Sequence, residues 1–466
     1  MNNSKIQGWI LDLYHKNGKM NIWVKSKSGL HQLTDEWIPS IYVSGEKSDL
    51  IELARLLNNS NILFEEKYLS PETHRKSEVL KIPVHTHNQA LELAKYITLS
   101  SRKFSLFNVD IPPEQIYLYE KNIFPLAQIE ANPNYNSIRW KIIDKSSDIN
   151  YQIPELNCID LDITTNSQNK ISSFKDKLQK ITIRNQEEAI IIDSNDEEEN
   201  FLELVRLFKK IDPDVIYTHN GNSFLFPYIE KHAQKLGISN QIILGREQNP
   251  LKILRRKGRS YFSYGRIHYR PTSIRILGRI HIDTKHSYFH NDCGLEGIIE
   301  ISRTCRIPLQ KCVDSTIGTS MTSIQLYHAF RKDILAPWFK ALPEDLKTAE
   351  ELIIADRGGL YYSPRVGVHD DVGELDFSSL YPTLMCKFNL SGETVRCRCC
   401  PQSRNKVPEL GYNICEKRRG IVPISLEELL EKRLRYKQMM KEARSPLLKE
   451  NYRKRQAALK WILVCA

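Results

Sequence analysis

The sequence predicts a multidomain α/β protein, and three observations support this fold class. The chain has 466 residues, enough for about three domains of roughly 150 residues each. Apolar residues make up 41% of it, which supports packed cores rather than disorder. Strand and helix patterns alternate between residues 150 and 300, as expected of an α/β layer, and a helical hairpin follows near the C-terminus.

The N-terminal region, residues 1–150, mixes short strands and helices. The segments WILDLY and MNIWVKS read as two strands around a turn at residues 16–19, which contains Asn-Gly. The segment DLIELARLL, residues 49–57, has helical periodicity. We therefore expect an N-terminal α+β domain, and no residue pattern in it indicates chemistry.

The middle of the chain alternates between strand patterns and helix patterns. LNCIDLDIT and EEAIIIDS are typical of buried strands, EENFLELVRLFKKI of an amphipathic helix, and DVIYTHN of a third strand. Residues 320–355 look helical. The segment GGLYYSPRVGVHDDVGELDF, residues 358–377, reads as two strands that lead into the sequence DFSSLYP.

The C-terminal region predicts two helices that form a hairpin. Ser425 with Glu428 has the spacing of a capping box, and Ser445-Pro446 ends one helix and begins the next. Three basic residues, Arg433, Lys437 and Lys460, would then reach a similar depth along the antiparallel pair. They form either a clamp for a triphosphate or ordinary surface charge.

Two segments are each strongly net positive, +9 and +8, in a chain whose formal net charge is +11. Residues 251–280 contain nine Lys/Arg and no acid, and residues 415–466 contain 14 Lys/Arg and 6 Asp/Glu. Tyrosine and phenylalanine are interleaved with the first segment, which favours a nucleic acid over a merely solvated charged face. The predicted DNA-binding residues there are Arg255, Arg256, Lys257 and Arg259.

No apolar run is long enough for a membrane span, and the polar N-terminus does not resemble a signal peptide. We expect no membrane partner and a cytoplasmic, nucleoid-associated location. Four of the ten cysteines are clustered: Cys397, Cys399, Cys400 and Cys415. They either bind a structural Zn²⁺ through thiolates or remain unligated or redox-paired, and the adjacency of Cys399 and Cys400 counts against a shared tetrahedral ion.

Several motifs together carry a resemblance to a known family. DFSSLYP resembles the first polymerase motif of the family B DNA polymerases, and RQAALKWILVCA resembles the start of their fingers motif. LNCIDLDITT and IDPDVIYTHNGNSFLFPYI resemble the first and second motifs of their exonuclease domain. The sequence is identified as a member of this family, similar to an archaeal subgroup with a degenerate exonuclease domain.

The resemblance implies roles for individual residues. Asp376 would bind the two Mg²⁺ ions of nucleotidyl transfer, with help from the backbone carbonyl of Phe377. Tyr381 would pack under the sugar of the incoming deoxynucleoside triphosphate. Arg433, Lys437 and Lys460 would hold its triphosphate. The implied substrates are a DNA primer-template and deoxynucleoside triphosphates.

The exonuclease motifs depart from the family pattern. Asp162 is followed by Ile163-Thr164, so threonine stands where the family has glutamate, and Leu225 stands where the second motif has aspartate. The third motif aligns best with residues 319–323, which contain neither tyrosine nor aspartate. Asp160 could substitute for one acid only. We therefore expect an RNase H-like domain without exonuclease activity, unless these motifs are misaligned.

The resemblance also suggests a domain division. It gives an N-terminal domain (1–150), an exonuclease-type domain (151–345), the first part of the palm (346–396), a Cys-rich insertion (397–420) and the helical hairpin of the fingers (421–466). Val464 and Cys465 replace the Asn and Ser of the fingers motif. A relaxed pocket of this kind favours repair or lesion bypass over replication.

The family motif that carries a second metal-binding acid does not occur in the sequence. We expect no polymerase activity from this chain alone. The expected completion is a second chain that supplies the rest of the palm and the thumb; a truncated gene or a partial sequence are the other accounts. The competing function is a non-catalytic protein that binds primer-template DNA.

Overall fold

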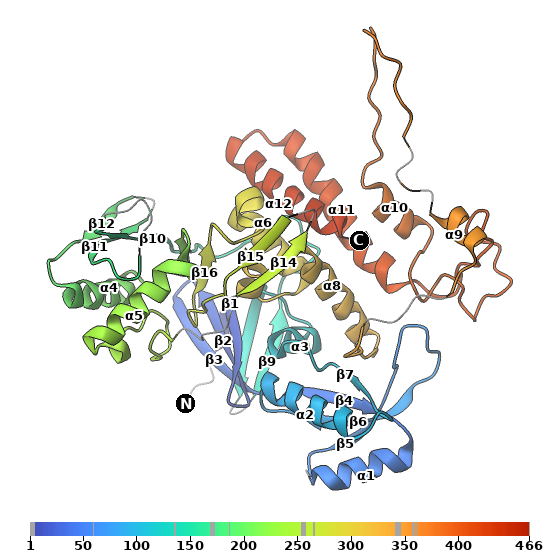
Figure 1. Ribbon diagram of the computed structural model, residues 1–466, viewed down its shortest axis with the longest axis horizontal. Coiled ribbons are helices and arrows are strands. Elements are labelled where there is room, and N and C mark those ends of the chain that lie inside the picture. The colour runs from blue at the N-terminus through green and yellow to red at the C-terminus, as the bar shows by residue number, and fades with distance from the viewer. Residues whose placement is uncertain are drawn as a thin grey trace. The chain divides into compact units, whose positions relative to one another are not determined.

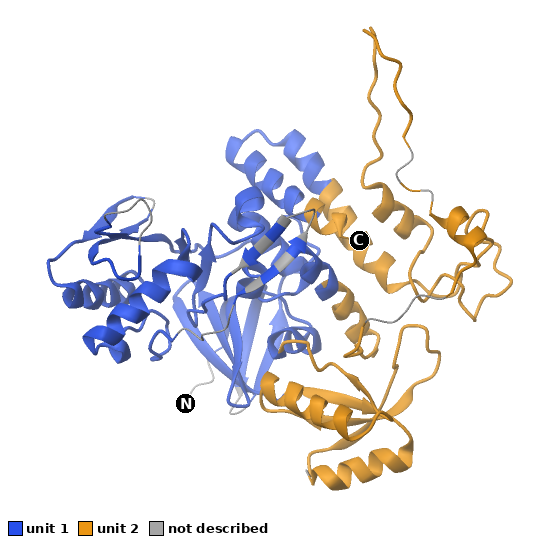
Figure 2. Cartoon of the chain, in the orientation of Figure 1, with its two compact units in different colours: residues 1–38, 113–323, 435–459 blue, residues 39–112, 324–434, 460–466 orange. Residues whose placement is uncertain are grey.

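The computed structural model describes residues 5–58, 60–134, 137–167, 173–185, 187–252, 258–263, 266–340, 346–356, 358 and 361–465 (Figure 1). The chain forms two compact units, and each is built from separated stretches of sequence (Figure 2). Unit 1 comprises residues 1–38, 113–323 and 435–459, and unit 2 comprises residues 39–112, 324–434 and 460–466. The five-domain division stays a prediction.

The first sheet of unit 1 is antiparallel, with strand order β3-β2-β1-β8-β9. Its strands are β1 (Ile6–Lys16), β2 (Lys19–Ser26), β3 (Gly29–Glu36), β8 (Gln128–Asn134) and β9 (Ser137–Ile142). Lys16 pairs with Lys19 across the predicted β1–β2 turn. Asn17 and Gly18 both have positive φ, 53° and 73°, as a two-residue hairpin turn requires. The predicted hairpin is confirmed.

The second sheet of unit 1 is mixed, with order β12-β11-β10-β13-β16. Its strands are β10 (Cys158–Thr165), β11 (Leu178–Arg184), β12 (Ala189–Ile192), β13 (Val215–Thr218) and β16 (Ile280–Asp283). Strand β13 runs parallel to both β10 and β16. Apolar side chains of helices α4 (Glu197–Ile211) and α5 (Phe226–Leu236) share one buried cluster with those of the sheet. The predicted alternation of strands and helices is confirmed.

The remaining elements of unit 1 surround these sheets. They are α3 (Pro113–Lys121), the π-helix η1 (Gly221–Leu225), the 3-10 turn η2 (Ser239–Gln241), the hairpin β14 (Arg259–Ser263) and β15 (Arg266–Arg270), α6 (His290–Cys305) and α7 (Leu309–Val313). The division between the units falls within three helices, α8 (Ile317–Arg331), α11 (Ile421–Glu442) and α12 (Pro446–Val464).

Unit 2 contains an antiparallel sheet of order β5-β6-β4-β7. Its strands are β4 (Ser40–Ser44), β5 (Leu63–Lys67), β6 (Ser77–Pro83) and β7 (Ser105–Phe107). The predicted helix α1 (Lys47–Leu57) and helix α2 (His87–Ser100) pack their apolar faces on this sheet. Unit 2 also holds the short helices α9 (Ala349–Ala355) and α10 (Leu380–Lys387).

The prediction of two strands across residues 358–377 is wrong for the described residues 361–377, which contain no strand. This segment is an extended excursion between α9 and α10 (Figure 1). Its apolar side chains are open to solvent: the relative solvent-accessible surface is 103% for Val366, 96% for Val368 and 99% for Leu375. Strand hydrogen bonds need a neighbouring strand, and no described strand pairs with this segment.

The predicted helix start at Ser425 is also wrong. Helix α11 begins one turn earlier, at Ile421, and the Ser425 hydroxyl donates a hydrogen bond back to the Ile421 carbonyl at 2.8 Å. The predicted start of α12 is confirmed, because Pro446 is its first residue and the Ser445 carbonyl accepts from the Lys449 amide at 3.0 Å. Among the described residues, no helix combines the length and apolar character that crossing a membrane requires.

Candidate nucleotide and nucleic-acid sites

The motif DFSSLYP forms the approach to helix α10. Asp376 is exposed, as are Phe377 (76%) and Tyr381 (69%). Pro382 is buried and Ser379 has a positive φ of 51°, so the chain turns sharply just before the helix. The turn leaves the acid and both aromatic rings open to solvent.

Helix α11 brings one of the predicted cations to this turn. A guanidinium nitrogen of Arg433 donates a hydrogen bond to the Ser379 hydroxyl, three residues from Asp376. Burial lowers the pKa of Arg433, and its Nε–H is buried without a hydrogen-bond partner in the described residues. Such a guanidinium retains donor capacity for an anion. Lys437 lies one helical turn further along α11 and Lys460 is exposed on α12, and their convergence on one triphosphate stays a prediction.

The predicted exonuclease positions lie on β10 and η1. Asp162 is exposed, and its carboxylate accepts the Ile163 amide at 2.9 Å. Thr164 is partly buried, and Asp160 is exposed two residues before Asp162. Leu225 is only 1% exposed and belongs to the apolar core of the sheet. A carboxylate at that position would therefore be buried among apolar side chains.

Sequence reasoning missed the acid that shapes this region, Asp283 at the end of β16. Its buried carboxylate accepts the backbone amides of Asn220 at 3.0 Å and Asn222 at 2.9 Å. Between them, Gly221 leaves no room for a side chain, because an added Cβ would lie 2.0 Å from the Thr218 hydroxyl. The available signal was an acid directly after a buried strand. Its role is to hold the loop that follows β13.

The structure describes only part of the basic segment, residues 251–280. Arg255, Arg256 and Lys257 lie outside the described residues, and Arg259 begins strand β14. On the β14–β15 hairpin, Phe262 (73%), Ile267 (78%) and Tyr269 (60%) are exposed. Exposed aromatic rings on such a hairpin are suited to stacking on bases. DNA binding by this segment stays a prediction.

The four clustered cysteines form a compact group of thiols. The sulfur atoms of Cys397, Cys399, Cys400 and Cys415 all lie within 4.8 Å of one another. Cys399 and Cys415 are separated by 3.5 Å, Cys399 and Cys400 by 3.7 Å, and Cys400 and Cys415 by 3.8 Å. Four thiolates about 2.3 Å from a zinc ion would be about 3.8 Å apart. The geometry fits Zn²⁺, and the adjacency of Cys399 and Cys400 does not prevent it.

Neighbouring groups orient these thiols. The Asn413 amide donates to the Cys397 sulfur at 3.5 Å and to the carbonyls of Cys397 and Cys400. Burial acts to raise the pKa of Cys415, but hydrogen bonds from the Lys417 and Arg418 amides and from the Cys399 and Cys397 thiols together lower that pKa to about 7. Outer partners of this kind are typical of metal ligands. Within the described residues, no other group of three or more potential ligands is close enough to hold one ion.

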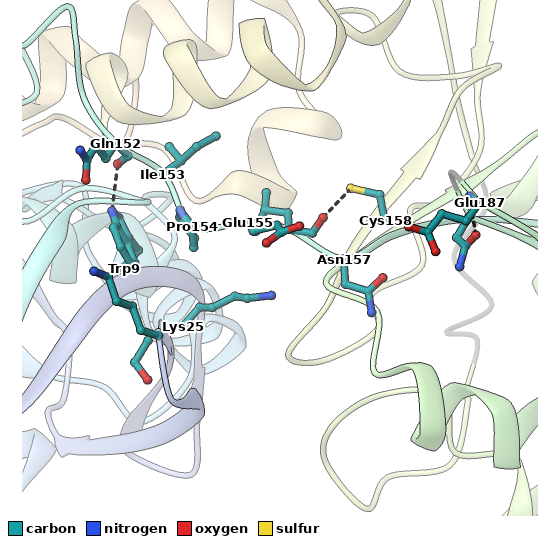
Figure 3. Close-up of a pocket in the computed structure, with 13 residues that line it drawn as sticks. Trp9, Lys25, Gln152, Ile153, Pro154, Glu155, Asn157, Cys158 and Glu187 are labelled. Carbon is teal, nitrogen blue, oxygen red and sulfur yellow. Dashed lines mark hydrogen bonds between the residues drawn. The ribbon is translucent and has the colours of Figure 1, made fainter.

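A cavity of about 920 Å³ in unit 1 lies beside the connection that leads into β10 (Figure 3). Trp9 on one wall donates to the Gln152 carbonyl at 2.9 Å. Lys25 is paired with Asp214, and the other charged lining residues are Lys27, Glu155 and Glu187. The two lysines and two glutamates of the lining balance in charge, so the cavity favours neither an anionic nor a cationic ligand.

Comparison with known proteins decides the family. The model for "DNA polymerase family B" matches residues 313–465, and that for "DNA polymerase family B, exonuclease domain" matches residues 168–291. The chain belongs to the family B DNA polymerases. This family B chain has the fold of the family B DNA polymerase from the hyperthermophilic archaeon Pyrobaculum calidifontis, with a TM-score of 0.72 at 19% identity. That match covers 99% of this chain and 67% of the solved one.

Curated relatives of this family B chain share part of its length. It is 27% identical over 308 residues to a DNA polymerase of Pyrococcus horikoshii, covering 57% of this chain and 24% of the relative. It is 32% identical over 188 residues to DNA polymerase 2 of Saccharolobus solfataricus, covering 40% and 26%. It is 24% identical over 478 residues to DNA polymerase 1 of Pyrococcus abyssi, covering 87% and 58%. The chain thus spans between about a quarter and three fifths of these relatives.

Proposed function

We propose that this chain contributes the first metal-binding acid and the fingers of a DNA-directed DNA polymerase, which transfers nucleotides to a primer 3′-hydroxyl on a DNA template. The observation that carries the proposal is the hydrogen bond from Arg433 on α11 to Ser379 in the DFSSLYP turn. It joins the predicted triphosphate cation to the turn that presents Asp376. Tyr381, exposed on the first turn of α10, is available to an incoming sugar.

Polymerases of this family use divalent metal ions, and Mg²⁺ bound with substrate phosphates takes one or two carboxylates. Asp376 supplies one exposed carboxylate. No group of three potential ligands forms around it in the described part of the chain. A two-ion site is therefore incomplete with these residues, and we propose that a second chain carrying the rest of the palm and the thumb completes it.

The test is primer extension by this chain reconstituted with such a partner. Asp376→Ala is expected to reduce extension by at least about a hundredfold, because electrostatic positioning supplies most of the catalysis in phosphoryl transfer. Binding of primer-template DNA should change by less than about twofold, since one exposed acid makes little contact with phosphates. The matched control is Asp370→Ala, an exposed acid on the same segment.

Extension that survives Asp376→Ala would contradict the role of this acid.

The same primer-extension reactions also report on the exonuclease-type domain. We propose that it is inactive, because Leu225 is buried in the core and Thr164 offers no carboxylate. Shortening of the labelled primer in the absence of nucleotides would contradict that proposal.

A second candidate is a non-catalytic protein that holds primer-template DNA during repair or lesion bypass. The incomplete ligand set around Asp376 favours it. The two candidates separate cleanly, because a pure binder would bind DNA with the same salt dependence but show no extension with any partner chain.

We further propose that the cluster of Cys397, Cys399, Cys400 and Cys415 binds one structural Zn²⁺. The sulfur–sulfur spacings support this proposal. The Asn389 side-chain amide after α10 donates to the Cys415 carbonyl at 2.9 Å and accepts from the Gly420 amide just before α11 at 2.9 Å, which links the cluster to the start of that helix. The ion would thus stabilise the base of the fingers and take no part in nucleotidyl transfer.

A further inference from the structure

A second cavity, of about 380 Å³ and wholly within unit 2, has an excess of positive charge. Its lining comes from four parts of the chain: the loop after β5 (Tyr68, Pro71, Thr73, His74), the residues after α8 (Lys332, Ile334), the segment after α10 (Glu393) and the residues around the start of α11 (Arg418, Arg419, Ile421). Its size falls in the range of ligand pockets. None of these residues belongs to the DFSSLYP turn or to the predicted triphosphate cations.

Three basic side chains meet in this cavity. The Arg418 guanidinium donates to the Pro71 carbonyl at 3.0 Å, while its Nε–H is buried without a hydrogen-bond partner in the described residues. Lys332 donates to the Arg419 carbonyl at 3.1 Å. Burial and the neighbouring Arg418 lower the pKa of Lys332, against the attraction of Glu393. Like charges held this close are stabilised by an anion between them.

The single acid in the lining does not neutralise these cations. Glu393 is 9% exposed, and its carboxylate is already engaged by the Ile421 amide at 2.6 Å and by the Ser391 hydroxyl. Arg419 has one exposed acidic neighbour, Glu427, at 3.4 Å. The cavity therefore keeps a net positive charge and unused guanidinium donors, which suit a phosphate group.

Aromatic and imidazole rings stand beside the cations. Tyr68 and His74 line the same cavity, and the Tyr68 backbone is held in place by a bridge to Ile334. A cationic groove with a ring alongside is the arrangement that binds single-stranded nucleic acid, where a phosphate meets the cations and a base meets the ring.

We propose that this cavity binds a phosphate group of a single-stranded nucleic acid, such as an unpaired stretch of template. The inference rests on the proposed DNA-binding function and adds a contact to it. Free phosphate would meet the same donors, so the experiment must distinguish a strand from a free ion.

The test measures binding of a fluorescent oligothymidylate to the full chain by anisotropy at several salt concentrations. Arg418→Gln and Arg419→Gln are each expected to weaken binding about fourfold to tenfold and to reduce the salt slope by about 0.7, the value for one phosphate contact on a single strand. The matched control is Lys417→Gln, which removes the same charge from an exposed neighbour that does not line the cavity. Its affinity should remain within about twofold of the wild type.

Thermal unfolding checks that each variant is folded. If loss of the bond to Pro71 unfolds Arg418→Gln, Arg419→Gln carries the test alone, because the Arg419 side chain pairs with an exposed acid, Glu427, and not with the buried interior. Variants that bind the oligonucleotide like Lys417→Gln would overturn the inference. The inference would also be overturned if inorganic phosphate bound the wild type but not Arg419→Gln, while Arg419→Gln bound the oligonucleotide as tightly as the wild type. A wild-type chain that binds no DNA would instead contradict the proposed function.

Discussion

His281 shows how one buried residue sets a pH dependence. Its ring lies 2.8 Å from the Thr218 hydroxyl through Nε2 and 3.3 Å from the Ile274 carbonyl through Nδ1, edge-on to Phe226. Burial lowers the pKa of His281 to about 4, although Asp283 opposes the shift. The folded protein therefore holds this imidazole neutral at a pH where the unfolded chain would protonate it.

Lowering the pH should accordingly destabilise the fold through His281. Its folded pKa lies below the unfolded value of 6.5, so the stabilisation is complete above pH 6.5 and is lost as the pH falls towards 4. The loss reaches roughly 3 kcal/mol. Denaturant unfolding of the wild type and His281→Gln across this range measures it.

The difference between the two proteins is the informative quantity. Burial raises the pKa of Asp12 to about 6, so Asp12 shifts stability in the opposite direction over part of the same range. That contribution is present in both proteins and cancels. A difference that stays constant from pH 7 to pH 4 would show that His281 is not held neutral.

At the scale of the element, α11 owes its start to a glutamate distant in sequence. The Ile421 amide donates to Glu393 at 2.6 Å, and the Gly420 amide donates to Asn389 at 2.9 Å. A carboxylate at a helix N-terminus satisfies an orphan amide and interacts favourably with the helix dipole.

Glu393→Ala should therefore cost about 1–2 kcal/mol of unfolding free energy. Glu431→Ala, an exposed glutamate within α11, should cost less than about 0.5 kcal/mol. Equal losses in chemical denaturation would refute the capping role.

The cysteine cluster that precedes α11 gives a second prediction at this scale. Metal analysis of the purified chain should find one zinc per molecule, and Cys399→Ser should lose it, because a hydroxyl is a far poorer zinc ligand than a thiolate. A chelator should then lower the melting temperature of the wild type but not that of Cys399→Ser. Cys465→Ser, at an exposed thiol outside the cluster, serves as the control. A wild-type chain that contains no zinc and is insensitive to chelator would exclude the site.

Local sequence could predict some elements and not others. The β1–β2 hairpin and helix α4 were predictable, because their turn residues and periodicity act over a few positions. The start of α11 was not, because Ser425 matched the capping pattern while Glu393 made the actual contact. Residues 361–377 were misassigned for a related reason. Their pattern fits strands, but a strand forms only where another strand supplies its hydrogen bonds.

At the scale of the whole molecule, the units could not be predicted from the order of the sequence. Unit 1 includes residues 435–459, which the family resemblance assigns to the fingers, together with residues 1–38. The candidate site residues Asp376, Arg433 and Asp162 could be named from the sequence because they lie in short motifs, and their roles stay predictions. The cavity lined by Arg418 and Lys332 was not predictable, because its parts come from distant stretches of the chain.

A buried polar network within unit 1 accounts for the inclusion of these late residues. Glu300 on α6 is fully buried, and its carboxylate accepts the hydroxyls of Tyr151 at 2.8 Å and Tyr436 at 2.7 Å. Arg455 lies 4.5 Å from the centre of the Tyr151 ring and pairs with Glu296 at 2.9 Å. A buried carboxylate depends on each of its donors, because water cannot replace one that is lost.

Tyr436→Phe should therefore destabilise the protein out of proportion to one lost hydroxyl. It removes a donor from buried Glu300 and should cost about 1.5–3 kcal/mol. Tyr452 is a matched control, because its ring stacks on that of Tyr436 with centroids 6.0 Å apart, while its hydroxyl makes an exposed contact of 3.4 Å with Asn150. Tyr452→Phe should cost less than about 0.5 kcal/mol. In Glu300→Gln, the further effect of Tyr436→Phe should shrink, because a neutral amide needs the hydroxyl less than a carboxylate does. Additive effects of the two changes in denaturant unfolding would show that the hydroxyl and the carboxylate act independently, and that packing alone holds residues 435–459 in unit 1.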